Sequence, residues 1–127
     1  MSVGLPTYHS SDGRVALAIS NMVVQVLREH TGRGPSKSRT HLNDNLISVV
    51  VEHTLTRAEH TLVANGNTEI VLSARKALQE TMREDLVAGV EALTGRTVSA
   101  FFSDNSIDPD IALESFLLAP QVDRPPG

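Results

Sequence analysis

The sequence predicts an α+β domain in which helices are packed on one face of a four-stranded antiparallel sheet. A long amphipathic stretch at 68–95 has the residue spacing of a helix, and pairs of short strand-like segments flank it on both sides. Another amphipathic stretch precedes the first pair. The resulting order is α-β-β-α-α-β-β, and hairpins that alternate with helices in this way favour an antiparallel sheet covered on one face.

Composition limits the classes of function. The chain has 127 residues with a net charge of −4, which argues against a nucleic-acid or anionic membrane surface. It contains no cysteine, so disulfides, thiolate metal sites and a cysteine nucleophile are excluded. The first residues lack the pattern of a secretory signal, and no run of about 18 apolar residues occurs. We therefore expect a cytoplasmic protein with a single domain at 12–118, between flexible tails at 1–11 and 119–127.

The first helix is predicted over 13–31. Its apolar residues recur at spacings of three and four, which marks one face of a helix. Gly32 follows the last turn, where a left-handed residue commonly ends a helix. The predicted apolar face comprises Val15, Ala18, Ile19, Met22, Val23, Val26 and Leu27.

A hairpin is predicted at 36–43 and 45–54, with its turn at Asp44-Asn45. This turn sets Leu42 opposite Ile47, Thr40 opposite Val49 and Ser38 opposite Val51. It sets Lys37 opposite Glu52, Arg39 opposite Val50 and His41 opposite Ser48. One face is then apolar and the other largely polar, so this hairpin needs helices on one side only.

A short helix begins after the capping box Thr56-Arg57-Ala58-Glu59 and stops near 65–67. The long helix follows and ends at Gly95. We expect Arg75 and Gln79 to lie mostly away from its apolar stripe. That stripe is predicted to contain Val71, Ala74, Leu78, Met82, Leu86, Val90 and Leu93.

The second hairpin is predicted at 97–103 and 111–118. The first strand would place Val98, Ala100 and Phe102 on one face, and the last strand Ile111, Leu113 and Leu117. The open face of the sheet would then be apolar, which is typical of an interface. We predict a homodimer formed through that face or along the long helix. The candidate interface residues are Leu46, Val50, Phe101, Phe116 and Leu118.

The loop at 32–39 is a candidate anion site, carried by Arg33, Gly34, Lys37 and Arg39. Glycines expose backbone amides, and the cations lie close together. The same residues also suit a helix cap, a proline turn and a solvated strand. The order lacks the spacing of a phosphate-binding P-loop.

No metal, cofactor or catalytic set is predicted. Of the five histidines, His53 and His60 are seven residues apart, and no pair has the spacing of a zinc site on one helix. The acidic turn at 104–110 lacks the ligand order of an EF-hand. No Gly-x-Ser-x-Gly elbow is present. We therefore expect a protein that is not an enzyme.

The order of motifs resembles the MpsC family over 13–118. The resemblance rests on Gly-Arg-Gly-Pro at 32–35, the Asp turn, Leu-Thr-Arg-Ala-Glu at 55–59, Leu-Thr-Gly-Arg at 93–96 and Ser-Asp at 103–104. Membership would imply a soluble accessory protein associated with a membrane-potential-generating system linked to sodium or inorganic-carbon transport. The family supplies no catalytic residues to assign. The positions that match it are Gly34, Pro35, Asp44, Glu59, Gly95 and Asp104.

Three functional hypotheses follow. The first is a non-enzymatic accessory or regulatory protein that binds a membrane-transporter component and no nucleic acid. The second is an anion- or nucleotide-binding module that uses the Gly-Arg-Gly-Pro loop. The third, an enzyme, has the least support from the residues.

Overall fold

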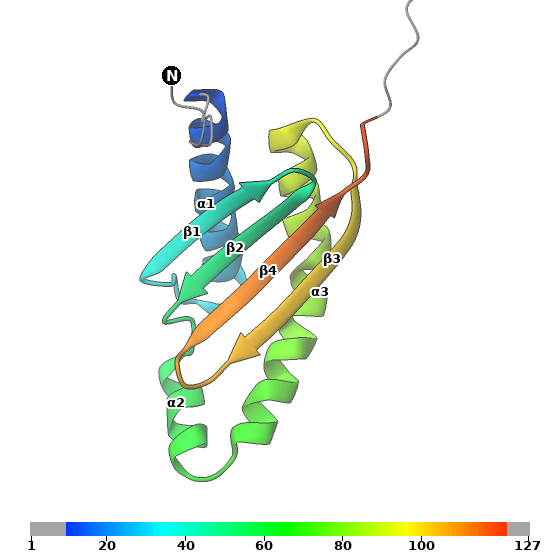
Figure 1. Ribbon diagram of the computed structural model, residues 1–127. Coiled ribbons are helices and arrows are strands. Elements are labelled where there is room, and N and C mark those ends of the chain that lie inside the picture. Colours follow the sequence, from blue (N-terminus) through cyan, green and yellow to red (C-terminus); the bar gives the residue numbers. More distant parts are fainter. Residues whose placement is uncertain (1–9, 122–127) are drawn as a thin grey trace, which may run out of the picture.

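The computed structural model describes residues 10–121, so most of each predicted tail, at 1–11 and 119–127, lies outside this part of the chain. The predicted fold class and element order are confirmed: helices pack against a four-stranded antiparallel sheet (Figure 1). The elements are α1 (Ser10–Thr31), β1 (Lys37–Asn43), β2 (Leu46–Glu52), α2 (Arg57–Ala64), α3 (Thr68–Thr94), β3 (Val98–Ser106) and β4 (Ile111–Leu118).

The strand order in the sheet is β1-β2-β4-β3, so the central strands β2 and β4 come from different hairpins. The helices α1 and α3 lie side by side behind the sheet, α1 towards β1 and α3 towards β3 (Figure 1). The short helix α2 packs on the N-terminal part of α3 beyond one end of the strands (Figure 1). One face of the sheet therefore has both long helices against it.

The first hairpin has the predicted register. Leu42 pairs with Ile47, and Lys37 pairs with Glu52 at the other end. Asp44 occupies the turn with a positive φ of 53°, a conformation that Asp tolerates better than most residues. The predicted polar and apolar faces of this hairpin are thus confirmed.

The helix ends also follow local sequence. Thr56 and Glu59 form both hydrogen bonds of the predicted capping box at the start of α2. Gly95 has a left-handed φ of 69° and caps α3, as predicted. In the middle of α3, Gly89 allows α1 to come close, because a Cβ there would lie 2.6 Å from the Met22 sulfur.

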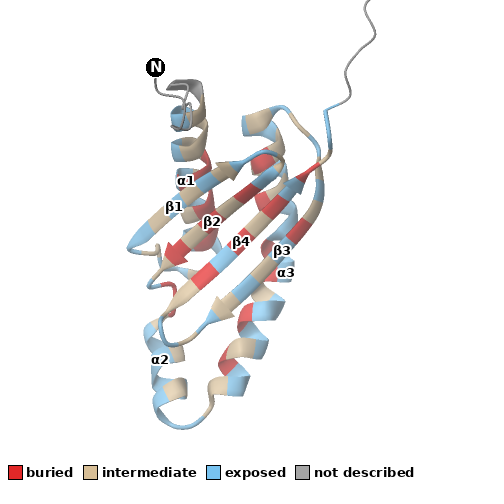
Figure 2. Cartoon of the chain, in the orientation of Figure 1, coloured by how far each residue is buried: buried red, intermediate tan, exposed pale blue. Residues whose placement is uncertain are grey.

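The core lies between the two long helices and the covered face of the sheet. Figure 2 shows buried residues alternating along the central strands and recurring along the helices. The fully buried apolar residues include Ile19, Val23, Val49, Val51, Met82, Leu86, Val90 and Phe116. The predicted first-helix face supplies the α1 part of this set.

The predicted faces of the second hairpin are wrong. Phe116 is fully buried and Leu118 is 4% exposed, so both belong to the core. Phe116 pairs with Ile47, and directly opposed residues on neighbouring strands point to the same face. Phe101 pairs with Phe116 and joins it, with ring centroids 5.1 Å apart. The reversal follows because β4 is apolar on both faces, and alternation alone does not tell which face is covered.

A register shift between Val98 and Ala100 also changes the faces of β3. One extra residue at this β-bulge moves Ala100 and Phe102 to the uncovered face, while Val98 packs against the core. The predicted grouping of Val98 with Ala100 and Phe102 is therefore wrong.

The buried side of α3 differs from the predicted stripe as well. Arg75 and Gln79 are 2% and 4% exposed, whereas Ala74 is exposed. These two polar side chains find hydrogen-bond partners in α2 and in β3 and β4, which the helical spacing alone does not reveal. Leu93, at the far end of the stripe, is 38% exposed.

Candidate functional site

The uncovered face of the sheet, here termed the open face, is formed by all four strands. Every second residue of each strand points to it, and the registers align these residues in four rows that run across the sheet. From β1 to β3 the rows are Asn43, Leu46, Leu117 and Ala100; His41, Ser48, Ser115 and Phe102; Arg39, Val50, Leu113 and Asp104; and Lys37, Glu52, Ile111 and Ser106.

The open face carries large apolar side chains on both sides of its central Ser48–Ser115 pair, although it faces outward. Leu46, Leu113 and Leu117 are each about two-fifths exposed, and Phe102 is 62% exposed. Within residues 10–121, all three helices lie away from this face (Figure 1). A contiguous set of exposed large apolar side chains costs free energy in water, and such patches commonly mark binding surfaces.

The two edges of the open face carry opposite charges. Lys37, Arg39 and His41 project from β1, and all three are exposed. Asp104 projects from β3 at the other edge and is also exposed. The face is therefore an apolar strip between a cationic edge and an acidic residue.

Only part of the predicted interface lies on this face. Leu46 and Val50 are on it, as predicted. Phe101, Phe116 and Leu118 are not, because they point to the helices and are at most 7% exposed. Phe102, Leu113 and Leu117 lie on the open face but were predicted on the covered face. Their apolar character, together with the register of β4 against β2, would have identified them as residues of the open face.

The predicted anion-binding residues are distributed between a loop and a strand. Arg33 donates from Nε to the His53 carbonyl at 3.2 Å, which ties the loop after α1 to the end of β2. Gly34 lies against Arg28, because a Cβ there would be 2.7 Å from an Arg28 guanidinium nitrogen. Lys37 and Arg39 project instead from the open face of β1. The Arg28 side chain is flexible and can move, so the loop favours glycine at Gly32, where φ is 76°, and anion binding stays a prediction.

A buried ion pair links α2, α3 and the preceding loop. Arg75 donates to Glu59 from Nε and Nη2, at 2.9 and 2.7 Å, and also to the Thr54 carbonyl. Burial alone would raise the pKa of Glu59, but the hydrogen bonds from Arg75 and the Thr56 amide outweigh it, so this pKa lies below its usual value. The pair holds α2 against α3.

The turn before β4 is tied to the same region. The Asp110 carboxylate accepts hydrogen bonds from the backbone amides of Thr54 and Leu55, at 3.0 and 3.1 Å. It also accepts one from the Thr54 hydroxyl at 3.1 Å. Asp110, which the sequence suggested only as part of an acidic turn, therefore has a structural role in joining two loops.

A second buried carboxylate lies on the covered face of β4. Glu114 is fully buried and accepts hydrogen bonds from Gln79 Nε2, at 3.1 Å, and from the Ser103 hydroxyl. The Gln79 and Asn105 amides bond to each other at 2.8 and 3.1 Å. Burial raises the pKa of Glu114 to about 7, against the opposing effect of these hydrogen bonds. Glu114 was not predicted as a buried carboxylate because the predicted faces of β4 were reversed.

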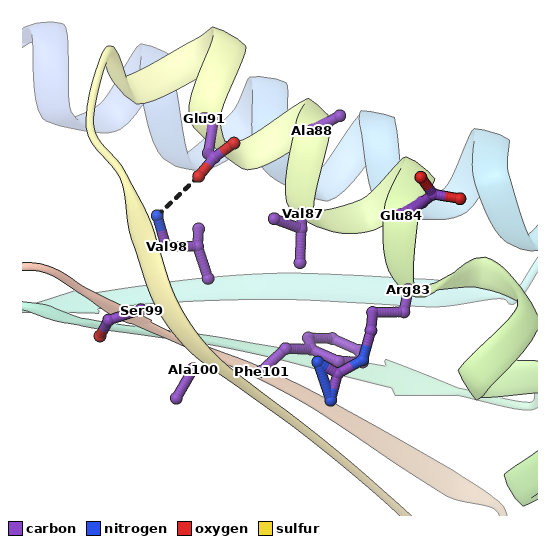
Figure 3. A pocket seen from close by; sticks show the side chains of 9 residues that line it. All are labelled: Arg83, Glu84, Val87, Ala88, Glu91, Val98, Ser99, Ala100 and Phe101. Atoms are coloured by element: carbon purple, nitrogen blue, oxygen red, sulfur yellow. Dashed lines mark hydrogen bonds between the residues drawn. The ribbon is translucent and has the colours of Figure 1, made fainter.

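A groove of about 340 Å³ runs between α3 and the edge strand β3 (Figure 3). The Arg83 guanidinium lies 5.4 Å from the centre of the Phe101 ring, and Glu91 accepts a hydrogen bond from the Val98 amide at 2.8 Å. Glu84 and Ser99 also line it. These side chains do not form a hydrogen-bonded nucleophile and base. In the described range, no group of three His, Asp or Glu side chains is placed to hold a metal ion.

Comparison with known proteins identifies the family. The family model described as "Na+-translocating membrane potential-generating system (MpsC)" matches residues 11–120. No curated protein and no solved structure gives a significant match. Among residues 10–121, no helix is both long and apolar enough to cross a membrane. Since the match spans most of the chain and includes every element of the fold, this protein belongs to the MpsC family.

Proposed function

We propose that this protein is a cytoplasmic accessory or regulatory component of a membrane-potential-generating system, and that it acts by protein contact rather than by catalysis. The observation that carries the proposal is the open face. Exposed Leu46, Phe102, Leu113 and Leu117 lie together on a sheet whose other face is packed against helices. The free-energy cost of hydrating these side chains is removed when another protein covers them.

The rest of the molecule supports a contact role. The buried side chains of Arg75 and Glu114 are engaged in internal hydrogen bonds, Arg75 with Glu59 and Glu114 with Gln79 and Ser103. These networks join elements of the fold and do not project a reactive group into a groove. The description of the family names a system at a membrane, where an accessory protein works by contact with the system's other components.

The alternative, an anion- or nucleotide-binding module at the Gly-Arg-Gly-Pro loop, has weaker support. Arg33 uses its Nε to hold the His53 carbonyl, and Lys37 and Arg39 belong to the edge of the open face. Their positive charge has a role in protein contact that needs no small anion.

Site-specific photo-crosslinking in the producing cell tests the proposal. A photoreactive residue placed at Phe102, which is 62% exposed, should crosslink to a component of the membrane system. The matched control is Leu17 on α1, which is 63% exposed but belongs to the helical layer. The proposal predicts a crosslink to a membrane protein from position 102 that is absent from position 17. Equal crosslinking at both positions, or none to a membrane protein, would contradict it.

A further inference from the structure

We propose that a second copy of this chain occupies the open face, related to the first by a two-fold axis that runs parallel to the strands between the two facing sheets. This inference rests on the proposed function, because it takes the open face to be a surface for protein contact. It adds the identity of one occupant and the geometry of the contact, and it makes the second copy and the membrane component alternative occupants of the same face.

Two symmetric arrangements bring two such sheets face to face with aligned strands. A two-fold axis along the strands lays β1 over β3 of the second copy and β2 over β4, since the strand order is β1-β2-β4-β3. Rotation about this axis does not change the position of a residue along the strand direction. Each row of one copy therefore faces the same row of the second copy. An axis across the strands instead lays each strand over itself and exchanges the two ends of the sheet.

The charges favour the axis along the strands. Arg39 and Asp104 belong to the same row, at opposite edges. This axis therefore brings Arg39 of each copy opposite Asp104 of the other, and symmetry forms the pair twice. The axis across the strands lays the β1 edges together, with Arg39 near His41 of the second copy. Lys37 would then face Asn43, so this axis gathers the positive charges of the two β1 edges and pairs none of them with a carboxylate.

The apolar residues favour the same axis. With the axis along the strands, Leu46 faces Leu117, Val50 faces Leu113 and Ser48 faces Ser115. Ile111 then faces Glu52, and Phe102 faces His41. With the axis across the strands, Leu117 faces Ile111, but Leu46 faces Glu52, Val50 faces Ser48 and Leu113 faces Ser115, so fewer apolar side chains face each other. Sheets that pack face to face are about 10 Å apart, which leaves room for these side chains to interlock.

The area of the open face sets the expected affinity of the dimer. With strands about 4.8 Å apart and a rise of about 3.3 Å per residue, four strands of this length cover a footprint of roughly 450 Å². A stable interface buries about 800 Å² of accessible surface on each partner, and protruding side chains make accessible surface larger than a flat footprint. The contact is therefore at the small end of specific interfaces, and we expect a dimer with a dissociation constant on the order of micromolar.

Charge reversal tests both the occupant and the axis. Arg39→Asp and Asp104→Arg each replace two attractive pairs in the dimer by two repulsive ones, so each variant alone should dissociate about tenfold more readily. An equimolar mixture of the two variants should regain the mass of a dimer, because the attractive pairs form again between unlike copies. Sedimentation velocity of each variant and of the mixture measures this. Arg14→Asp, an exposed α1 position with the same change in charge, is the control and should leave the dissociation constant unchanged.

Both reversed residues are exposed, so far-ultraviolet circular dichroism should show the variants folded. Recovery of the dimer on mixing supports the inference. A wild-type protein that stays monomeric at tens of micromolar overturns it, and so does tighter association of Arg39→Asp, which the axis across the strands would produce. A monomer that still crosslinks from position 102 to a membrane protein would overturn only the second-copy inference and leave the proposed function standing.

Discussion

The two faces of the sheet are built from the same strands and similar residues, yet they differ in what covers them. On β4, Phe116 and Leu118 are buried beneath the helices, whereas Leu113 and Leu117 on alternate positions are about two-fifths exposed. Their chemistry is nearly the same, and only the side of the strand differs. The comparison shows that apolar character alone does not distinguish a residue of the buried core from a residue of the open face. The covered face stabilises the fold, and the open face is available for association.

The largest expected effect separates two phenylalanines on the two faces. Phe116→Ala removes a fully buried ring and should lower the free energy of unfolding by about 3 to 5 kcal/mol. Phe102→Ala removes a ring that is 62% exposed and should change it by less than about 1 kcal/mol. Urea denaturation at dilute, monomeric concentration measures both. Similar losses for the two variants would contradict the assignment of the faces.

The covered face also contains a titrating carboxylate. Glu114 keeps its proton in the folded state up to a pKa of about 7, whereas the unfolded chain loses it near the ordinary pKa of 4.5. The stability linked to protonated Glu114 is therefore fully present below about pH 4.5 and is lost as the pH rises through about 7. The loss amounts to about 3 kcal/mol. Glu59 has the opposite sign, because its lowered pKa adds stability that is lost as the pH falls through it.

Glu114→Gln isolates that dependence, because glutamine carries no titrating proton. Relative to the wild type, the variant should gain up to about 3 kcal/mol of unfolding free energy between pH 4.5 and pH 7. Urea denaturation of both proteins across this range gives the difference at each pH. A difference that does not change with pH would contradict the raised pKa of the buried Glu114 carboxyl.

The smallest effect on folding, paired with a clear effect on association, is expected at Leu113 on the open face. Leu113→Ser should change the unfolding free energy by less than about 1 kcal/mol, because the side chain is already 39% exposed. It should raise the dissociation constant of the dimer at least tenfold, since the polar group would replace apolar contact in both halves of the interface. Leu62→Ser on α2, at 37% exposure, is the matched control and should leave association unchanged.

The register and the two faces of the first hairpin were predicted correctly from the sequence. For the second hairpin only the presence of the two strands was predicted correctly, and the difference has a physical reason. In the first, Asp44-Asn45 fixes the turn, and only one face is strongly apolar, so the register and the core side follow together. In the second, both faces of β4 are apolar, and the bulge after Val98 shifts the alternation of β3. The covered side is decided by pairing between β2 and β4, whose paired residues are 59 to 71 positions apart in the sequence.

The buried polar residues could not be predicted from the sequence, because their burial also depends on contacts between distant segments. Arg75 and Gln79 look like solvated positions of an amphipathic helix, and Glu114 looks like the outward residue of a strand. Their partners come from α2, β3 and β4, so only the assembled fold shows that they are satisfied inside. The capping box at Thr56 and the left-handed Gly95 were predictable because their causes are local.

The solution mass of the wild-type protein over a dilution series tests the central claim most directly. Sedimentation equilibrium should give twice the chain mass of 13.7 kDa at tens of micromolar and approach 13.7 kDa on dilution below micromolar. Leu113→Ser should remain near 13.7 kDa over the same range. A wild-type mass of 13.7 kDa at every concentration, or a dimer that Leu113→Ser does not weaken, would contradict the claim that a second copy associates through the open face.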